Sequence, residues 1–320
     1  MVRAMADMKH LFGAEAATTF LGLDHHTVDA LPAGCDVVVF GAPCATAYEW
    51  VGPYCKDAPA AIRGASTTYA TTRNHINFDL GGQPVPEGCV AVDAGDLPFD
   101  AADSAGNRDR IRAACRSVLE AGAVPVVMGG DDSIPIPLLQ AYEGRGPITL
   151  VQIDAHIDWR DEVRGERWGL SSTMRRCSEM PHVGTMVQIG RRGVGSARPA
   201  DAEAALRRGV HFFDARTFHR DGAAPVAEVI PEGSDIFLTI DADGFDPTTM
   251  PAVIGPEPGG LNYFQGLDII DTVASRGRIV GFDLVEFVPA NDVNGVAALT
   301  AFRLTAHAIG RILQQRRPGA

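Results

Sequence analysis

The chain contains the stretch Ile148-Thr149-Leu150-Val151-Gln152-Ile153-Asp154-Ala155-His156-Ile157-Asp158, in which an apolar run ends in alternating polar residues. The length of the apolar run and its β-branched residues predict a buried strand. Side chains alternate along an extended chain, so Asp154, His156 and Asp158 share one side while that conformation continues. Mixed carboxylate and imidazole groups suit manganese, nickel or zinc better than calcium. The stretch predicts either a metal-ligating strand end or an acidic loop that merely closes a strand.

A second stretch has the same construction. The apolar run 236–240 is followed by Asp241-Ala242-Asp243-Gly244-Phe245-Asp246-Pro247, in which Asp241 and Asp243 again fall on one side. The two stretches together offer five ligand groups, more than one hard cation needs from a protein, and carboxylates can bridge two ions. The pair therefore favours a hydrolytic centre with two metal ions over two unrelated acidic loops.

Strand-like and helix-like runs alternate along the rest of the chain. Runs rich in Val and Ile predict strands at 36–40, 89–93, 124–128, 148–154, 186–189, 210–213, 235–241 and 278–283. Helical patterns fall at 58–66, 107–121, 136–142, 201–208, 263–275 and 297–315. This order predicts an α/β fold, a single three-layer domain whose mainly parallel sheet of roughly eight strands is covered by helices on both faces.

The chain shows no linker-like break in composition and no internal repeat. We therefore expect one catalytic domain at residues 31–320, preceded by an N-terminal arm or short helix at residues 1–30. Ligands of an open parallel sheet bind beyond the carboxyl ends of its strands. Asp132, both acidic stretches and Glu286 all follow predicted strands, so this rule gathers them at one edge of the sheet.

Composition narrows the range of partners. The 320 residues are 46% hydrophobic and 21% charged, and a net charge of −12 argues against a nucleic-acid partner. No apolar run approaches the ~18 residues of a membrane span, so no membrane association is expected. Six cysteines without a C-x-x-C pair, and no secretory apolar region near residue 1, indicate reduced thiols and a cytoplasmic protein.

Four motifs in a fixed order resemble those of the ureohydrolase family, which includes arginase, agmatinase and the guanidino-acid hydrolases. The family pattern is Gly-Gly-Asp-His-Ser, then Asp-Ala-His-x-Asp, then Ser-x-Asp-x-Asp-x-x-Asp-Pro, and finally a glutamate after a strand. The chain reads Gly129-Gly130-Asp131-Asp132-Ser133, then the two stretches above with Thr239 in the serine position, and then Gly281-Phe282-Asp283-Leu284-Val285-Glu286. The segments 41–43, 58–63 and 256–261 add to the resemblance, which covers roughly residues 36–310 and implies an arginase-like fold.

The resemblance also implies a set of site residues. It assigns one metal ion to Asp132, Asp154, Asp158 and Asp241, and the other to Asp154, His156, Asp241 and Asp243. The two divalent ions would be manganese, or else nickel, and a hydroxide bridging them would attack a guanidinium carbon to give urea and an amine. Glu286 would pair with the planar guanidinium, and Asp158 would steer the hydroxide.

Two departures from the family pattern alter the expected chemistry. Asp132 replaces a neutral histidine and adds one negative charge to the centre. Ser171 or Ser172 stands where most family members carry another histidine. A hydroxyl is a weak proton donor, so Ser172 is expected to contribute hydrogen bonding to the substrate instead. Trp159, next to Asp158, either stacks on the guanidinium or covers the edge of the core.

These residues predict a metal-dependent amidinohydrolase that cleaves a linear guanidino compound: agmatine, a guanidino acid or a substituted guanidine. The loops 44–54 and 159–174 would accept the rest of the substrate. The alternative is a low-activity or silent subunit that assembles with an active paralogue. A single-zinc deacetylase fits poorly, because it has no use for Asp243 or Glu286. By resemblance we expect a homo-oligomer, a trimer or hexamer, or a hetero-oligomer with that paralogue.

Overall fold

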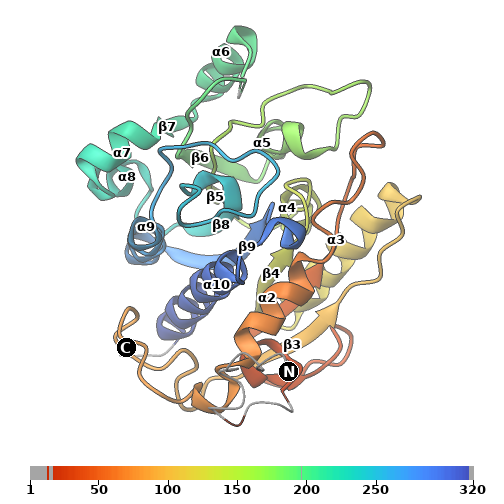
Figure 1. Ribbon diagram of the computed structural model, residues 1–320, viewed down its shortest axis with the longest axis vertical. Coiled ribbons are helices and arrows are strands. Elements are labelled where there is room, and N and C mark those ends of the chain that lie inside the picture. Colours follow the sequence, from red (N-terminus) through yellow and green to blue (C-terminus); the bar gives the residue numbers. More distant parts are fainter. Residues whose placement is uncertain (1–12, 14–16, 196, 317–320) are drawn as a thin grey trace, which may run out of the picture.

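A sheet of nine parallel strands forms the centre of the computed structural model, which describes residues 13, 17–195 and 197–316 (Figure 1). The strands are β1 (Asp24–His25), β2 (Val37–Ala42), β3 (Ala91–Asp96), β4 (Val124–Gly129), β5 (Ile148–Ile153), β6 (Val183–Ile189), β7 (His211–Phe213), β8 (Asp235–Asp241) and β9 (Arg278–Val285). Their order across the sheet is β1-β3-β2-β4-β9-β8-β5-β6-β7, and each adjacent pair is parallel. The predicted α/β fold with a mainly parallel sheet is confirmed.

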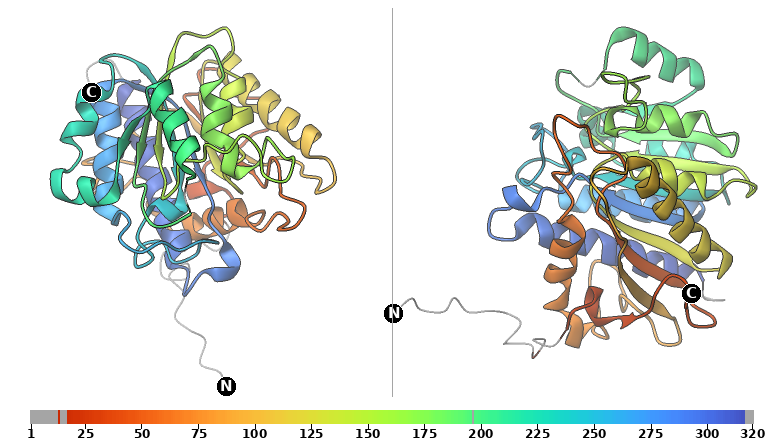
Figure 2. Two further views of the ribbon diagram at one scale, coloured as in Figure 1. Left: turned by 90° about the horizontal axis from the view of Figure 1, so that it is seen from above. Right: turned by 90° about the vertical axis from the view of Figure 1, so that its right-hand side faces the viewer.

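Helices cover both faces of this sheet (Figure 2). One face carries α2 (Ala58–Thr67), α7 (Ala215–Asp221), α8 (Ala224–Val229), α9 (Tyr263–Arg276) and α10 (Val296–Gln315). The other face carries α3 (Ser104–Glu120), α4 (Pro135–Gln140), α5 (Thr173–Ser178) and α6 (Pro199–Arg208). The predicted helices are all present, with ends shifted by a few residues. Helices α5, α7 and α8 were not predicted, because each spans only six or seven residues and shows no clear helical period, whereas the equally short α4 was predicted.

Strand β2 illustrates why the central strands are almost entirely apolar. Val37 and Val39 pack into the cluster beneath α2 and α10, whereas Val38 and Phe40 pack into the cluster beneath α3 and α4. All six residues of β2 are buried, and the same holds for β4 and β5. A strand covered on both faces therefore reads as a continuous apolar run rather than an alternating one.

Part of the predicted N-terminal arm belongs to the sheet. Strand β1 pairs with β3, and Phe20 is fully buried with its ring centroid 5.7 Å from that of Phe302 in α10. Strand β1 was not predicted, because Asp24 and His25 are polar and show no strand pattern. Residues 1–12 and 14–16 of the arm lie outside the described residues, and the domain boundary after residue 30 stays a prediction.

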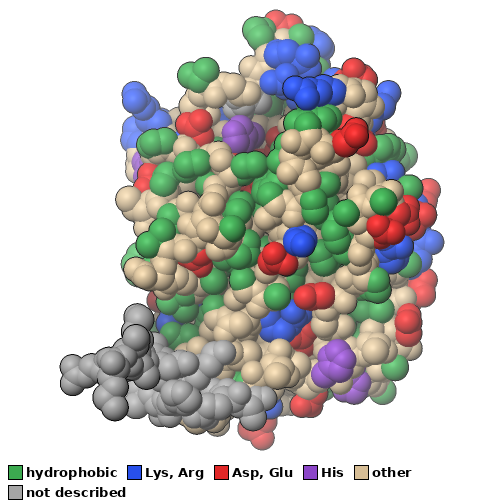
Figure 3. All heavy atoms as spheres, turned by 45° about the vertical axis from the view of Figure 1, so that its right-hand side comes forward, with side chains coloured by type: hydrophobic (Ala, Val, Ile, Leu, Met, Phe, Trp, Pro, Cys, Tyr) green, Lys and Arg blue, Asp and Glu red, His purple; other side chains and the backbone are tan. Residues whose placement is uncertain are grey.

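Helix α10 packs across the centre of its face of the sheet. Among the described residues it alone is long and apolar enough to cross a membrane by length and composition, and 72% of the qualifying window is buried inside the protein. Such burial is typical of a core helix. On the face shown in Figure 3, acidic and basic side chains are interspersed, and no continuous basic stripe crosses the described part of that face.

Candidate active site

The four central strands, β4, β9, β8 and β5, lie side by side and end at the same edge of the sheet (Figure 1). Asp154 follows β5, Asp241 is the last residue of β8, Glu286 follows β9, and Asp132 lies shortly beyond β4. Each of these four residues is at most 3% exposed. The topology thus collects buried acidic residues that are as much as 154 positions apart in the sequence.

The turn after β4 lies close to the loop after β2 and to the turn after β9. A Cβ atom at Gly130 would lie 1.8 Å from the carbonyl oxygen of Pro43, so only glycine lets the loop after β2 come this near. The backbone N–H of Glu286 donates to the carbonyl oxygen of Gly130 at 2.7 Å, and the N–H of Asp132 donates to Glu286 Oε1 at 2.8 Å. These bonds fix the turns after β4 and β9 relative to each other.

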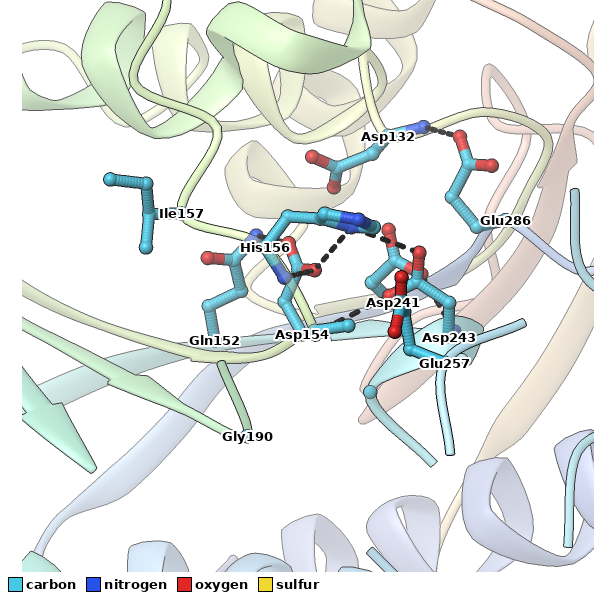
Figure 4. Close-up of polar contacts among 12 residues, drawn as sticks. Asp132, Gln152, Asp154, His156, Ile157, Gly190, Asp241, Asp243, Glu257 and Glu286 are labelled. Atoms are coloured by element: carbon cyan, nitrogen blue, oxygen red, sulfur yellow. Dashed lines mark hydrogen bonds and ion pairs between the residues drawn. The ribbon is translucent and has the colours of Figure 1, made fainter. Parts of the chain in front are cut away.

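Two groups of ligand atoms stand at this edge (Figure 4). The first group is Asp132, Asp154 and Asp241, the second is Asp154, His156 and Asp243, and within each group the ligand atoms lie within 4.8 Å of one another. His156 Nδ1 is 3.1 Å from Asp243 Oδ2 and 3.4 Å from Asp154 Oδ1. Two ligand groups that share one carboxylate are the arrangement expected of a two-ion centre. Asp241, expected to bridge, lies in the first group only.

Asp158 adjoins Asp154 but belongs to neither group. Its φ of 42° lies in the left-handed region, which non-glycine residues rarely adopt and which recurs at functional sites. Burial, and next the charge of Asp154, raise the pKa of Asp158 well above its ordinary value, and the two carboxyl groups hydrogen-bond each other. The opposite pKa shifts of Asp154 and Asp158 favour one proton held between the two carboxyl groups in the metal-free protein. The assignment of Asp158 as a metal ligand stays a prediction, and a divalent cation between the two carboxyl groups would replace that proton.

The surroundings of the Asp132 carboxylate show that metal ions fit these residues. Both of its carboxylate oxygens are buried and lack a hydrogen-bond partner among the described residues. Burial, followed by the charges of Asp158 and Asp154, raises the pKa of Asp132 well above its ordinary value. A buried carboxylate without partners destabilises a fold, and a divalent cation would supply the missing partner. The donor set of carboxylates and one imidazole fits manganese, nickel or zinc.

His156 is the one cationic group of the two ligand sets. Burial alone would lower its pKa, but its hydrogen bonds to Asp154 and Asp243 outweigh this effect and raise the pKa to about 12. The imidazole thus faces an excess of negative charge through Nδ1. A metal ligand must be the neutral imidazole, so ion binding at this group would release a proton.

Two buried amides orient Asp154, and sequence reasoning missed both. Gln152 Nε2 donates to Asp154 Oδ2 at 2.7 Å. Gln188 Nε2, from β6, donates to Gln152 Oε1 and to the carbonyl oxygen of Ile157 at 3.1 Å. Hydrogen bonds of this kind fix the geometry of metal-ligating carboxylates. The available signal was a glutamine next to the last residue of each of two mainly apolar strands.

Glu286 is held from three directions at the same edge. Its φ of 64° is left-handed, its N–H bonds to Gly130, and its Oε1 accepts from Asp132. The Tyr54 hydroxyl lies 2.9 Å from Oε1 and 2.7 Å from Oε2. Burial, followed by the charge of Asp131, raises the pKa of Glu286 to about 8, against the hydrogen bond from Tyr54. Tyr54 was missed as an individual residue; its only signal was a place in the loop 44–54.

Trp159 and Ser172, which were predicted to contact the substrate, are both buried. Trp159 is 3% exposed and belongs to the apolar cluster that contains Ile157 and Met174, which favours packing over stacking on a substrate. Ser172 is fully buried, and its hydroxyl has no hydrogen-bond partner among the described residues. The hydroxyl of the next residue, Thr173, donates to the carbonyl oxygen of Asp132. Substrate contacts by Trp159 and Ser172 stay predictions.

Comparison with known proteins agrees with this site. A model of the arginase family matches residues 35–310 of the chain. The N(1)-aminopropylagmatine ureohydrolase of Thermus thermophilus is 33% identical over 256 residues, which are 79% of this chain and 84% of the relative. The mitochondrial agmatinase of Gallus gallus is 32% identical over 277 residues, which are 85% of this chain and 79% of the relative.

Solved structures share the fold over nearly the whole chain. A hypothetical agmatinase from Burkholderia thailandensis has a TM-score of 0.80 at 26% identity and covers 95% of this chain and 93% of its own. The proclavaminate amidinohydrolase from Streptomyces clavuligerus has a TM-score of 0.79 at 28% identity, with 94% and 98% covered. The match to the family model and the relatives above 30% identity together show that this chain belongs to the arginase family.

Proposed function

We propose that this protein is a metal-dependent amidinohydrolase that hydrolyses a linear guanidino compound to urea and an amine. The observation that carries the proposal is the position of Glu286 beside the two ligand groups. Its Oε1 is held 2.8 Å from the backbone nitrogen of Asp132, a member of the first group. A buried carboxylate suited to a planar cation therefore lies next to a pair of candidate cation sites.

The residues of the site support distinct parts of this chemistry. Two divalent ions, manganese first and nickel second, would supply Lewis acidity and bring the pKa of a water held between them toward neutrality. Glu286 would bind the guanidinium through two parallel hydrogen bonds and place its carbon over the ligand groups. Asp158, whose carboxyl group lies beside that of Asp154, would take up the proton that the water loses and pass it to the departing amine.

The substrate class rests on the relatives as well as on Glu286. Ureohydrolase, agmatinase and amidinohydrolase are the names of relatives 31–33% identical to this chain. These names support a guanidino group on a linear carbon chain as the shared element. Agmatine, a guanidino acid and a substituted guanidine are the candidate substrates.

A catalytically silent subunit is the less favoured alternative. A subunit free of ligand constraints gains nothing from an unpartnered buried carboxylate such as Asp132, since that group destabilises the fold. The same holds for the left-handed backbone at Asp158 and Glu286. The chain keeps all three features.

The test is urea release by protein reconstituted with Mn²⁺ or Ni²⁺, assayed with agmatine, guanidinobutyrate, guanidinopropionate and arginine. We expect release from at least one of these compounds, lost on chelation and restored by the metal. Glu286→Gln keeps the shape of the side chain but removes its charge, so kcat/KM should fall roughly 100-fold, equivalent to about 3 kcal/mol. No urea from any compound with either metal would overturn the proposal.

A further inference from the structure

Arg192, in the loop after β6, contacts both ligand-bearing loops although nothing in the sequence motifs marks it. Its guanidinium makes six hydrogen-bond contacts with its five N–H groups, one of which is shared between two acceptors, and all of the acceptors are backbone carbonyl oxygens. These belong to Gly190 (3.0 Å), Asp243 (2.7 Å), Gly244 (3.2 Å), Phe245 (3.0 Å) and Glu257 (2.7 and 3.1 Å). The side chain therefore binds the loop that follows β8, at the ligand residue Asp243 itself.

The backbone of Arg192 binds the other loop. Its N–H donates to the carbonyl oxygen of Ala155 at 3.0 Å, between the ligand residues Asp154 and His156. One residue thus joins the loop after β5 through its main chain to the loop after β8 through its side chain. We propose that Arg192 is a positioning residue that fixes these two loops relative to each other and so sets the affinity of the second ligand group for its divalent ion.

The two ligand groups depend on this link to different degrees. The second group takes Asp154 and His156 from the loop after β5 and Asp243 from the loop after β8, so its geometry changes whenever the loops shift (Figure 4). The first group takes Asp241, which is the last residue of β8 and is paired with Val285 in the sheet. The sheet holds Asp241, and Asp154, which both groups share, directly follows β5 and donates its N–H to the carbonyl oxygen of Ile189 in β6 at 2.9 Å. Loss of Arg192 therefore weakens the second group more than the first.

The surroundings of Arg192 fit a guanidinium and not an ammonium. A Cβ atom at Gly260 would lie 2.4 Å from Arg192 Nη2, so the loop leaves space for the flat side chain. Arginine presents five N–H donors in a rigid plane, whereas lysine presents three donors at one point. Lysine at this position would leave several of the five carbonyl oxygens without their donor.

Arg208 provides a matched control. It ends α6, and its guanidinium also donates only to backbone carbonyls, those of Ser178, Val183 and Gly184. Val183 is the first residue of β6, at the opposite end of the strand from Arg192. Arg208 therefore makes the same type of contact far from the ligand groups.

The experiment is calorimetric titration of metal-free protein with Mn²⁺, for wild type, Arg192→Lys, Arg192→Met and Arg208→Lys. His156→Ala identifies which binding step belongs to the second group. We expect Arg192→Lys to weaken that step roughly 10- to 100-fold and to leave the other step within about twofold, with a larger effect in Arg192→Met if that variant folds. Arg208→Lys should lower the melting temperature of the metal-free protein without moving either step.

The inference rests on the proposed two-ion centre, and the titration separates the two claims. A wild-type protein that binds fewer than two ions would overturn both. A wild-type protein that binds two ions, with both steps unchanged or equally weakened in Arg192→Lys, would overturn the role of Arg192 alone.

Discussion

The hydroxyl oxygen of Tyr54 lies within hydrogen-bond distance of both carboxylate oxygens of Glu286, at 2.9 and 2.7 Å. Burial raises the pKa of Tyr54, so the phenol keeps its proton and acts as the donor. The bond orients the carboxylate and stabilises its charged form against the effect of burial. A residue of the loop after β2 thus controls the group proposed to bind the guanidinium.

Tyr54→Phe should raise KM about tenfold with a smaller change in kcat, because Glu286 loses a hydrogen bond to its charged form. Glu286 must be ionised to bind a cation, and its pKa is raised to about 8, so KM should fall as the pH rises toward 8. In Tyr54→Phe the decrease in KM should occur at higher pH than in the wild type. Steady-state kinetics from pH 6.5 to 9.5 measure both effects.

The control is Tyr48→Phe. The Tyr48 hydroxyl accepts a hydrogen bond from the N–H of Ser171 at 3.3 Å, and among the described residues it makes no hydrogen bond to Glu286. Its removal should leave the pH dependence of KM in place. Equal effects of the two substitutions would contradict the specific role of Tyr54.

Asp132→Ala should remove the ion of the first ligand group and leave that of the second, because Asp132 belongs only to the first. Asp132→His should retain both ions, since a neutral imidazole can replace the carboxylate as a ligand. Metal content after dialysis, measured by plasma emission spectroscopy, distinguishes the variants. Loss of metal in the histidine variant would mean that Asp132 has a role other than ligation.

Asp283 should make the metal-free protein less stable as the pH rises. Its Oδ1 accepts from the Thr239 hydroxyl at 2.6 Å, its Oδ2 has no partner among the described residues, and burial raises its pKa from 3.8 to about 8. The folded state therefore favours the protonated form. The stability this provides is complete below pH ~4 and is lost as the pH rises to about 8, at up to about 1.4 kcal/mol per pH unit.

Asp283→Asn is the matching variant, because the amide oxygen can still accept from Thr239 and carries no charge at any pH. Urea unfolding of the metal-free proteins between pH 5 and 8 should show a flatter dependence for the variant than for wild type. Parallel curves would mean that Asp283 is ionised throughout this range.

The strand ends could be predicted from the sequence because they combine two local patterns, a Val/Ile-rich run and an acidic cluster directly after it. Asp154, Asp241 and Glu286 were placed at one edge on this basis, and the structure places them there. Strand β1 could not be predicted, since two polar residues become a strand only by pairing with β3. Its existence depends on tertiary contacts and not on local preference.

The residues that position the ligand groups could not be predicted from the sequence, for a related reason. Arg192, Gln188 and Tyr54 act through contacts with residues 31 to 232 positions away, and a single sequence does not show which distant residues come into contact. The left-handed backbone of Asp158 and Glu286 could not be predicted either, because Glu rarely adopts it and Asp adopts it at only a small share of its positions. The residue types predicted the chemistry of the site, but they did not predict the contacts that position its ligand groups.

The central claim is that two divalent ions and Glu286 form one hydrolytic centre. The most direct measurement is the metal content per chain after reconstitution with Mn²⁺, made on the same samples as the urea assay, for wild type and Asp154→Ala. We predict two ions per chain in the wild type, because Asp154 joins two ligand groups, and loss of both ions and of urea release in Asp154→Ala. A wild type that releases urea with one ion or none, or an Asp154→Ala variant that retains two ions, would contradict the account.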